Sequence, residues 1–237
     1  MKNFLKLSLI VILLSACQLV CAQDDLIREE RKVSGFHAVK ATGIASVYLQ
    51  KGDQEKVMVE VNDKVINERL KINVVANELH IRLEKGDKWQ NAKKDLKLKV
   101  YVTYKTLNKL EGSGATGFYA DDEIKADALK LELSGANTSK LNINAGKLEV
   151  ETSGAANATL SGEADKLMIK SSGASNVKAY DLKAESVSVE SSGVSNVFVT
   201  AQESLEVKAD GLSNINYKGN AKVITREISK MSHVKKQ

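Results

Sequence analysis

The 237-residue chain contains no proline and only two cysteines, Cys17 and Cys21. Proline removes a backbone hydrogen-bond donor from any strand it occupies, so its absence is compatible with long, uninterrupted β-ladders. Two cysteines so close to the N-terminus cannot cross-link the rest of the chain, which excludes a scaffold held by internal disulfides. Sheet pairing and a buried core must therefore hold the protein together.

Histidine and net charge are also scarce. The three histidines, His37, His80 and His233, are far apart, and none has a second histidine or a cysteine at metal-ligand spacing. This argues against a metal site or a histidine-based catalytic site, and no cofactor is expected. The net charge of +5 arises from 35 basic and 30 acidic residues spread along the chain, which argues against a nucleic-acid partner.

Long apolar runs are missing except near the N-terminus. Residues 1–22 contain Lys2 and Lys6, then an apolar run from Leu7 to Leu14, then small residues, which is the pattern of a signal peptide. The run is well short of the roughly 20 apolar residues that span a bilayer. We therefore expect export to the periplasm, the outer membrane surface or the medium.

Two processing sites compete in this segment. The residues VCA before Gln23 suit ordinary signal peptidase, whereas LSAC (Leu14–Cys17) resembles a bacterial lipobox, in which Cys17 would be acylated. An acyl chain on Cys17 is the one membrane contact that the sequence predicts.

One short motif is repeated along the second half of the chain, most plainly as SGAAN, SGASN and SGVSN. Its glycine returns about every 20 residues, a period typical of stacked units. Apolar residues stand six and four positions before the glycine, and four and six after it, and this period of two predicts strands. The sequence thus predicts an all-β fold, a parallel β-helix (solenoid) of about 20-residue rungs. The repeated glycines are Gly114, Gly135, Gly154, Gly173, Gly193 and Gly211.

The glycine and an asparagine three positions after it are the structural residues of the repeat. A sharp corner between strands requires positive φ, which glycine reaches without steric cost. The asparagines would meet their own copies one rung away, inside or capping the stack, and form a hydrogen-bonded row. Alternatively, the serine and asparagine rows could form a polar groove for sugar hydroxyls. The asparagines are Asn157, Asn176, Asn196 and Asn214, and in the degenerate last copy, KMSHV (Lys230–Val234), His233 takes their place.

The sequence before the repeat predicts a separate β part. We expect a flexible lead-in at 23–32, an N-terminal β part at 33–105 that caps the stack, and the repeat solenoid at 106–237, with 33–237 forming a single continuous domain. Two alternating runs, 45–49 and 56–61, predict a hairpin, and Asp63–Leu70 predicts a short helix with an Asp63 cap. Further strands are expected at 70–75, 78–83 and 96–104. The phrase TGIASV (Thr42–Val47) is itself a cousin of the repeat motif.

Several of these motifs together resemble a known family. The GFHAV opening followed by TGIASVYLQKGD, the ELHIRLEKG strand and the serial SG(A/V)SNV copies are similar to the bacterial family of the putative auto-transporter adhesin, head GIN domain. That family is common in secreted and envelope proteins of Bacteroidetes. The resemblance implies an extracytoplasmic β-solenoid with no established enzymatic activity.

An enzyme that acts on polysaccharides, a lyase or hydrolase on a β-helix scaffold, is the alternative from another class. The outward positions before each glycine interleave lysines and glutamates, with one adjacent pair of like charge, Glu149 and Glu151. This pattern favours a solvated, nearly neutral face over a catalytic pair of carboxylates. The acidic turns Asp121–Glu123, Glu163–Asp165 and Asp181 lack the regular spacing of calcium-binding repeats.

The remaining candidates for binding are aromatic. Trp89 lies in the lysine-rich loop GDKWQNAKKD, where it could dock an acidic glycan or a membrane surface, or plug the end of the stack. Tyr180 and Phe198 would begin any binding strip on the repeat. The sequence as a whole predicts a non-enzymatic, secreted or envelope-associated protein with an adhesin-like binding or surface-structural role, and a glycan or cell-surface ligand as its partner.

Overall fold

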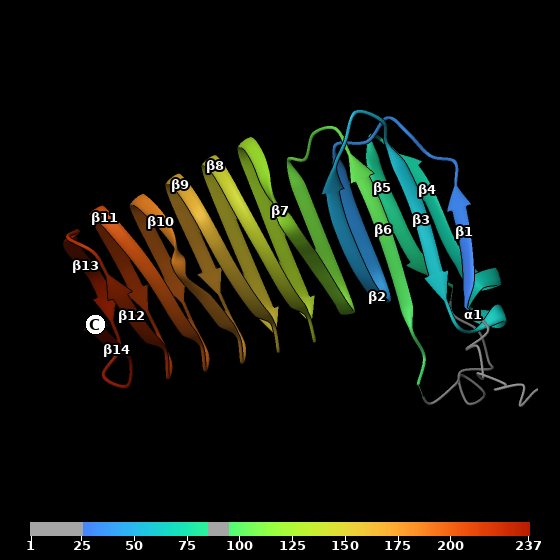
Figure 1. The fold of residues 1–237 in the computed structure, drawn as a ribbon. Helices are drawn as coiled ribbons and strands as arrows, with labels where there is room; N and C mark the ends of the chain where they lie inside the picture. Colours follow the sequence, from blue (N-terminus) through green and yellow to red (C-terminus); the bar gives the residue numbers. More distant parts are fainter. Residues whose placement is uncertain (1–25, 85–94) are drawn as a thin grey trace, which may run out of the picture.

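The computed structural model describes residues 26–84 and 95–237, and this part of the chain is nearly all β (Figure 1). One short helix interrupts a succession of strands, all of which belong to one hydrogen-bonded sheet. The elements are β1 (Ile27–Arg31), β2 (Ala38–Lys51), β3 (Lys56–Val61), α1 (Lys64–Arg69), β4 (Leu70–Val75), β5 (Glu78–Leu83), β6 (Leu98–Tyr104), β7 (Lys109–Gly135), β8 (Thr138–Gly154), β9 (Asn157–Ser171), β10 (Asn176–Ser191), β11 (Asn196–Ala209), β12 (Asn214–Lys218), β13 (Lys222–Ile228) and β14 (His233–Lys236).

The repeat forms a parallel solenoid of about 6 turns, which confirms the predicted fold class. Strands β7, β8, β9, β10 and β11 pair in sequence, each parallel to the next, and the rungs follow one another along the long axis of Figure 1. Each of β8–β11 runs from just past one Ser-Gly corner to the next, so the return turn is a bend within a continuous strand. Register shifts at this bend, between Tyr119 and Glu123 and between Lys178 and Asp181, absorb the unequal rung lengths.

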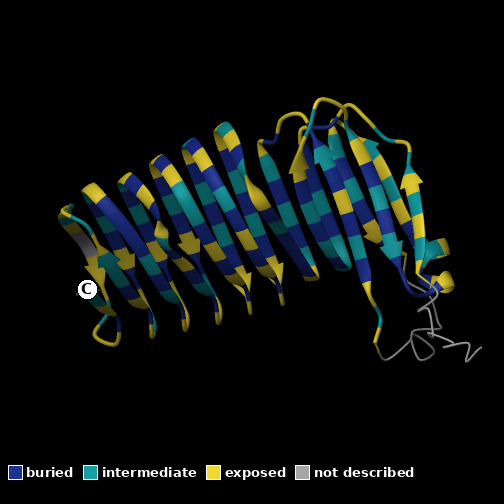
Figure 2. Ribbon diagram, in the orientation of Figure 1, coloured by how far each residue is buried: buried dark blue, intermediate teal, exposed yellow. Residues whose placement is uncertain are grey.

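The core lies inside the coil, where the alternating apolar residues of each rung meet. Along β8 and β9, Leu148, Val150, Leu167 and Ile169 are at most 1% exposed, and the residues between them face outward. Figure 2 shows this alternation as bands of dark blue and lighter colours along every rung. Burying a side chain of this kind stabilises the fold by about 1.5–3 kcal/mol, and each rung contributes several.

The corner glycines stack directly on one another. All six have φ between +68° and +93°, as predicted, and the structure adds a second requirement. The carbonyl of every one of these glycines except the last accepts a hydrogen bond from the backbone N–H of the residue after the next glycine, for example from Ala174 N to Gly154 O at 2.8 Å. A Cβ on Gly173 would lie 2.7 Å from that same Gly154 oxygen. Glycine is therefore required both by the backbone angle and by the approach of the neighbouring rung.

The N-terminal part begins the same coil. Gly43 of β2 pairs with Gly114, and Val47 pairs with Phe118, so TGIASV does occupy the first corner of the stack. The two halves of β2 pair in parallel with β5 and β6 respectively. Strand β4 then adds to β5, and β3 adds to β6, both antiparallel. The coil thus ends in two antiparallel extensions.

Three predictions for this part need correction or adjustment. The hairpin of 45–49 with 56–61 is wrong, because β6 lies between β2 and β3 and pairs with both. The lead-in at 23–32 includes strand β1, which pairs antiparallel with β3. The strand expected at 96–104 begins at Leu98. The helix is where it was expected, with the Asp63 side chain accepting a hydrogen bond from Ile66 N at 3.0 Å.

Replacing Gly173 by alanine should destabilise the protein by roughly 2–5 kcal/mol, from the left-handed φ and from the collision with the Gly154 carbonyl. Gly35 provides a matched control, since its φ is +79° but nothing lies within 4 Å of its Cβ position. Its replacement by alanine should cost only the conformational part, roughly 1–2 kcal/mol. Urea unfolding measures both, and equal losses would contradict the role given to glycine stacking.

Candidate ligand-binding face

Three tyrosines from distant parts of the sequence form one stacked row on the outer surface of the coil. Tyr48 of β2 pairs in register with Tyr101 of β6 on one side and with Tyr119 of β7 on the other. The ring centroids are 5.2 Å apart in both pairs, with interplanar angles of 24° and 25°. Tyr101 is 37% exposed, and the other two are half-buried. We call Tyr101, Tyr48 and Tyr119 the tyrosine row.

A groove of about 430 Å³ borders the tyrosine row. Polar side chains from the same three strands and from β8 reach it, so hydroxyl, amide, carboxylate and ammonium groups lie beside the rings. Its polar lining consists of Gln50, Thr103, Asp121, Asp122 and Lys140. Burial and the negative charge of Asp122 raise the pKa of the nearby Tyr104 to about 12. That hydroxyl therefore remains neutral across the physiological range.

Residues that pair in register on successive rungs form a column along the coil. The column that contains the tyrosines continues along the whole stack. Tyr119 pairs with Lys140, Lys140 with Thr159, and Thr159 with Lys178. Lys178 in turn pairs with Phe198, and Phe198 with Asn216. The register between rungs thus places one outward side chain of this column on every rung.

A second outward column, two positions earlier on each strand, carries the predicted asparagine row. The Nδ2 atom of Asn176 donates to Asn157 Oδ1 at 3.1 Å, that of Asn196 to Asn176 Oδ1 at 2.9 Å, and that of Asn214 to Asn196 Oδ1 at 3.2 Å. His233 pairs with Asn214, as the degenerate copy predicts. Residues two apart on a strand share a side, so the tyrosine row and the asparagine row define one surface, here called the binding face.

The asparagines do not point into the stack, which corrects the expected burial. They are half-buried or exposed, and the buried polar position is the serine one residue earlier. Ser175, Ser195 and Ser213 are 0% exposed, and each hydroxyl donates to the backbone carbonyl three residues back, at 2.9, 2.8 and 2.7 Å. These serines close the corner from inside, which leaves the asparagines free to face solvent.

Tyr180 and Phe198, which the sequence suggested as a binding strip, do meet at the other end of the binding face. Their ring centroids are 5.3 Å apart at an interplanar angle of 71°. The Lys218 ammonium lies 4.3 Å from the centre of the Tyr180 ring. Tyr180 belongs to β10 and not to a separate return turn, because the bend is part of the strand.

The charged strip before the glycines is a network of ion pairs on another side of the coil. Lys130 lies within 4.0 Å of Glu132, Glu149 and Glu151, and Glu149 also faces Lys147. Partial burial acts to raise the pKa of Glu149, but its hydrogen bond with Glu151 and the charges of Lys130 and Lys147 outweigh this and lower it. A general acid needs a raised pKa, so Glu149 lacks the electrostatics of a catalytic acid.

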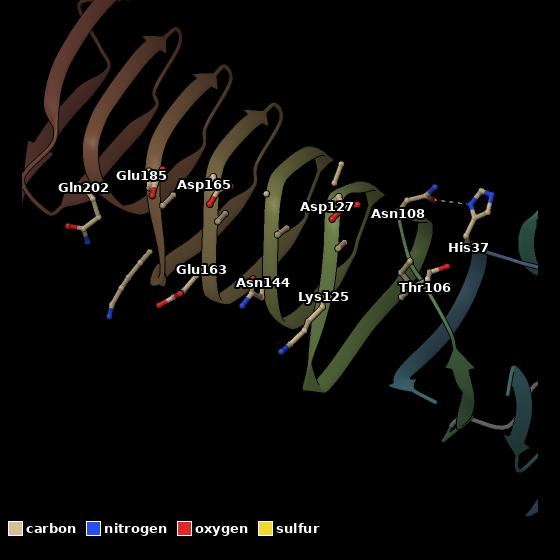
Figure 3. Close-up of a pocket in the computed structure, with 18 residues that line it drawn as sticks. His37, Thr106, Asn108, Lys125, Asp127, Asn144, Glu163, Asp165, Glu185 and Gln202 are labelled. Atoms are coloured by element: carbon tan, nitrogen blue, oxygen red, sulfur yellow. Dashed lines mark hydrogen bonds between the residues drawn. The ribbon is translucent and has the colours of Figure 1, made fainter. Parts of the chain in front are cut away.

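A larger groove of about 1240 Å³ follows the bend of the rungs (Figure 3). Alanines such as Ala145 and Ala164 form its buried floor. Asp127, Asp165 and Glu185 stand in one row along it, and Lys125, Asn144 and Glu163 stand in a second row. At one end His37 Nδ1 lies 3.2 Å from Asn108 Oδ1. Within residues 26–84 and 95–237, no group of three or more His, Cys, Asp or Glu side chains is placed to hold a metal ion.

Two sequence candidates fall outside the described residues. Trp89 belongs to the range 85–94 and Cys17 to the range 1–25. In the part of the chain that the structure describes, no helix is both long and apolar enough to cross a membrane.

The fold and this surface define a parallel β-solenoid with an antiparallel cap and a patterned outer face. The chain belongs to the family described as putative auto-transporter adhesin, head GIN domain, whose model matches residues 35–221. No curated protein matches the sequence.

Solved structures of similar proteins share the architecture. A putative adhesin from Bacteroides fragilis superposes with a TM-score of 0.81 at 25% identity, covering 90% of this chain and 97% of that one. A putative adhesin from Parabacteroides distasonis gives a TM-score of 0.68 at 24% identity, covering 90% and 97%. A putative lipid binding protein from the same species gives 0.65 at 18% identity, covering 91% and 98%. The last two similarities concern the fold alone.

The position of each asparagine in its row predicts its contribution to stability. Asn176 makes two side-chain hydrogen bonds in the row and Asn214 one. Because these amides are partly solvated, Asn176→Ala should cost about 1 kcal/mol and Asn214→Ala about half as much. Urea unfolding of both variants tests this order, and a larger loss for Asn214→Ala would show that the row is not a unit.

Lys109 should make stability depend on pH. Burial acts to raise the pKa of Glu111 and Glu132, but hydrogen bonds and charges from Lys109, Lys40 and Lys130 outweigh it and hold both below 4.5. The stabilisation is therefore present above pH 4.5 and lost as pH falls through the lowered values. Lys109→Met should remove about 1 kcal/mol at pH 7 and flatten the decline on acidification.

The control for this prediction is Lys166→Met, which removes an exposed lysine that has no ion pair among the described contacts. Its free energy of unfolding should follow the unmodified protein at every pH. If Lys109→Met and Lys166→Met give the same pH profile, the ion-pair network does not carry the stabilisation.

Proposed function

We propose that this protein is an extracytoplasmic, non-enzymatic binding protein that holds a glycan on its binding face, in the manner of an adhesin. The observation that carries the proposal is the tyrosine row, with centroids 5.2 Å apart. Its family and the relative from Bacteroides fragilis are described as putative adhesins, which supports a binding role without naming a ligand.

Tyrosines suit a carbohydrate because each offers an apolar ring and a hydroxyl on the same side chain. Sugars also combine apolar C–H surfaces with hydroxyl groups. Stacking restricts the three rings before a ligand arrives, so little side-chain freedom remains to be lost on binding. The spacing of the rings is comparable with the advance of one sugar residue along an extended polysaccharide.

The polar groups beside the row supply the directional contacts that a sugar requires. Gln50 and Thr103 are neutral donors and acceptors, while Asp121 and Lys140 add a charged acceptor and a charged donor. The asparagine row runs parallel to this column, and Asn176, Asn196 and Asn214 each donate one N–H within the row, whereas Asn157 only accepts there. The second N–H of each amide is available to a ligand hydroxyl.

An enzyme that acts on polysaccharides remains the alternative class, and no specific observation favours it. The adjacent carboxylates Glu149 and Glu151 are occupied by Lys130, Lys147 and Lys170. Export is part of the proposal and rests on the signal-peptide pattern of residues 1–22. Acylation of Cys17 would tether the protein to a membrane, and cleavage before Gln23 would release it.

A glycan array probed with the purified protein, followed by calorimetry on the best polysaccharide, tests the proposal. Tyr48→Ala removes the centre of the tyrosine row and should weaken binding at least tenfold, or about 1.4 kcal/mol. Tyr48→Phe keeps the ring and should lose less. Met168→Ala, a partly exposed apolar residue on the charged strip, is the control and should bind normally.

Two results would overturn this proposal. One is unchanged affinity in Tyr48→Ala. The other is turnover of a polysaccharide that disappears when a single carboxylate is replaced, because that would show an enzyme.

A further inference from the structure

The far end of the binding face carries a second aromatic cluster with a different chemical character. Tyr180, Phe198 and Lys218 come from three successive rungs, β10, β11 and β12, and contact one another in a chain. The ring centroids are 5.3 Å apart and meet edge to face. The Lys218 ammonium lies 4.3 Å from the Tyr180 ring centre, within the range of a cation–π interaction.

Positive charge gathers around this cluster. Lys178 precedes Phe198 in the outward column, and Lys235 follows Asn216 on β14. In the described part of the chain, Lys178, Lys218 and Lys235 form no ion pair. The lysines of the charged strip differ, because Lys109 and Lys130 are each within 4.0 Å of two or more glutamates.

We propose that Tyr180, Phe198, Lys178 and Lys218 form a subsite for an acidic sugar, whose ring contacts the aromatic pair while its carboxylate or sulfate binds the two ammonium groups. The ligand of the binding face is then an acidic polysaccharide, such as a polyuronate, that runs along the stack from the tyrosine row to this cluster. This inference rests on the proposed function and names its ligand class.

The cation–π contact favours this role for Lys218. It fixes the long side chain over the Tyr180 ring while the ammonium keeps N–H donors for an anion. A lysine already held in place loses less conformational freedom when the ligand binds. Because Lys218 forms no ion pair among the described contacts, no glutamate has to be displaced before its ammonium group binds an anion. The acidic residue nearest to this cluster along the chain is Asp181. Its single negative charge is outweighed by the three positive charges of Lys178, Lys218 and Lys235.

The column between the two aromatic clusters is compatible with one continuous ligand. Lys140 and Thr159 fill the rungs between Tyr119 and Lys178, so a fourth lysine without an ion pair among the described contacts lies on the path. Rungs of a parallel stack advance by about 4.8 Å, and a polymer lying along the axis would therefore meet a new side chain of this column at each step.

Calorimetry with polygalacturonate and a neutral β-glucan tests the inference. The unmodified protein should prefer polygalacturonate, and added NaCl should weaken that binding alone. The double variant Lys178→Gln with Lys218→Gln should bind polygalacturonate about tenfold more weakly, from two partly exposed ion pairs. Its affinity for the glucan should not change. Lys166→Gln removes an exposed lysine from another side of the coil and should leave both affinities unchanged.

The outcomes separate this inference from the proposed function. If the glucan binds as well as polygalacturonate, or if the double variant keeps full affinity, while Tyr48→Ala abolishes binding, the acidic subsite is wrong and the glycan-binding face stands. If Tyr180→Ala, with normal thermal unfolding, retains polygalacturonate binding, the aromatic part of the subsite is wrong. Binding of neither polymer overturns the inference, and an empty glycan array overturns the proposed function as well.

Discussion

The structure depends on the contact between successive corner glycines. Each glycine carbonyl both accepts the hydrogen bond from the next rung and occupies the space that a Cβ would need. This contact fixes the register of one rung on the next, and in a sheet a slip by one residue would turn every side chain to the opposite side. The ordered columns inside and outside the coil follow from that register. At the last corner Lys230 takes the glycine's place, and the Gly211 carbonyl instead accepts hydrogen bonds from the hydroxyls of Ser229 and Ser232.

The register also determines which polar residues face inward, which bond to one another on the outer surface and which form ion pairs. Serines just past the glycine face inward and donate to backbone carbonyls of the corner, while asparagines one position later face outward and bond to one another. Glutamates and lysines on the strip before the glycine neutralise each other. The far end of the binding face is different, because Lys178, Lys218 and Lys235 form no ion pair among the described contacts. Charge left free beside ordered aromatic rings is the reason for proposing this side as the surface that binds a ligand.

The sequence predicted the repeat well because its information is local. The alternating apolar residues, the glycine and the asparagine all recur at the rung period, and each needs only its own copy one rung away. Reading the period of two one step further would have placed Asn176 outside, since Val177 next to it faces inward. The hairpin was wrong because nothing local shows that β6 inserts between β2 and β3. The tyrosine row was missed for the same reason: Tyr48 and Tyr101 become neighbours only through that insertion.

Under the proposed function, the arrangement of the binding face in columns has a consequence for the affinity of a glycan. Each rung offers one outward side chain per column, so a single sugar meets only one or two of them and would bind weakly. A polymer aligned with the axis engages successive rungs, and once its first unit is held, each further contact forms within the same complex at high effective concentration. Affinity then grows with the length of polymer engaged, and short fragments compete poorly. Adhesion to a polysaccharide-coated surface presents long chains, which is the condition under which a column of individually weak contacts is sufficient.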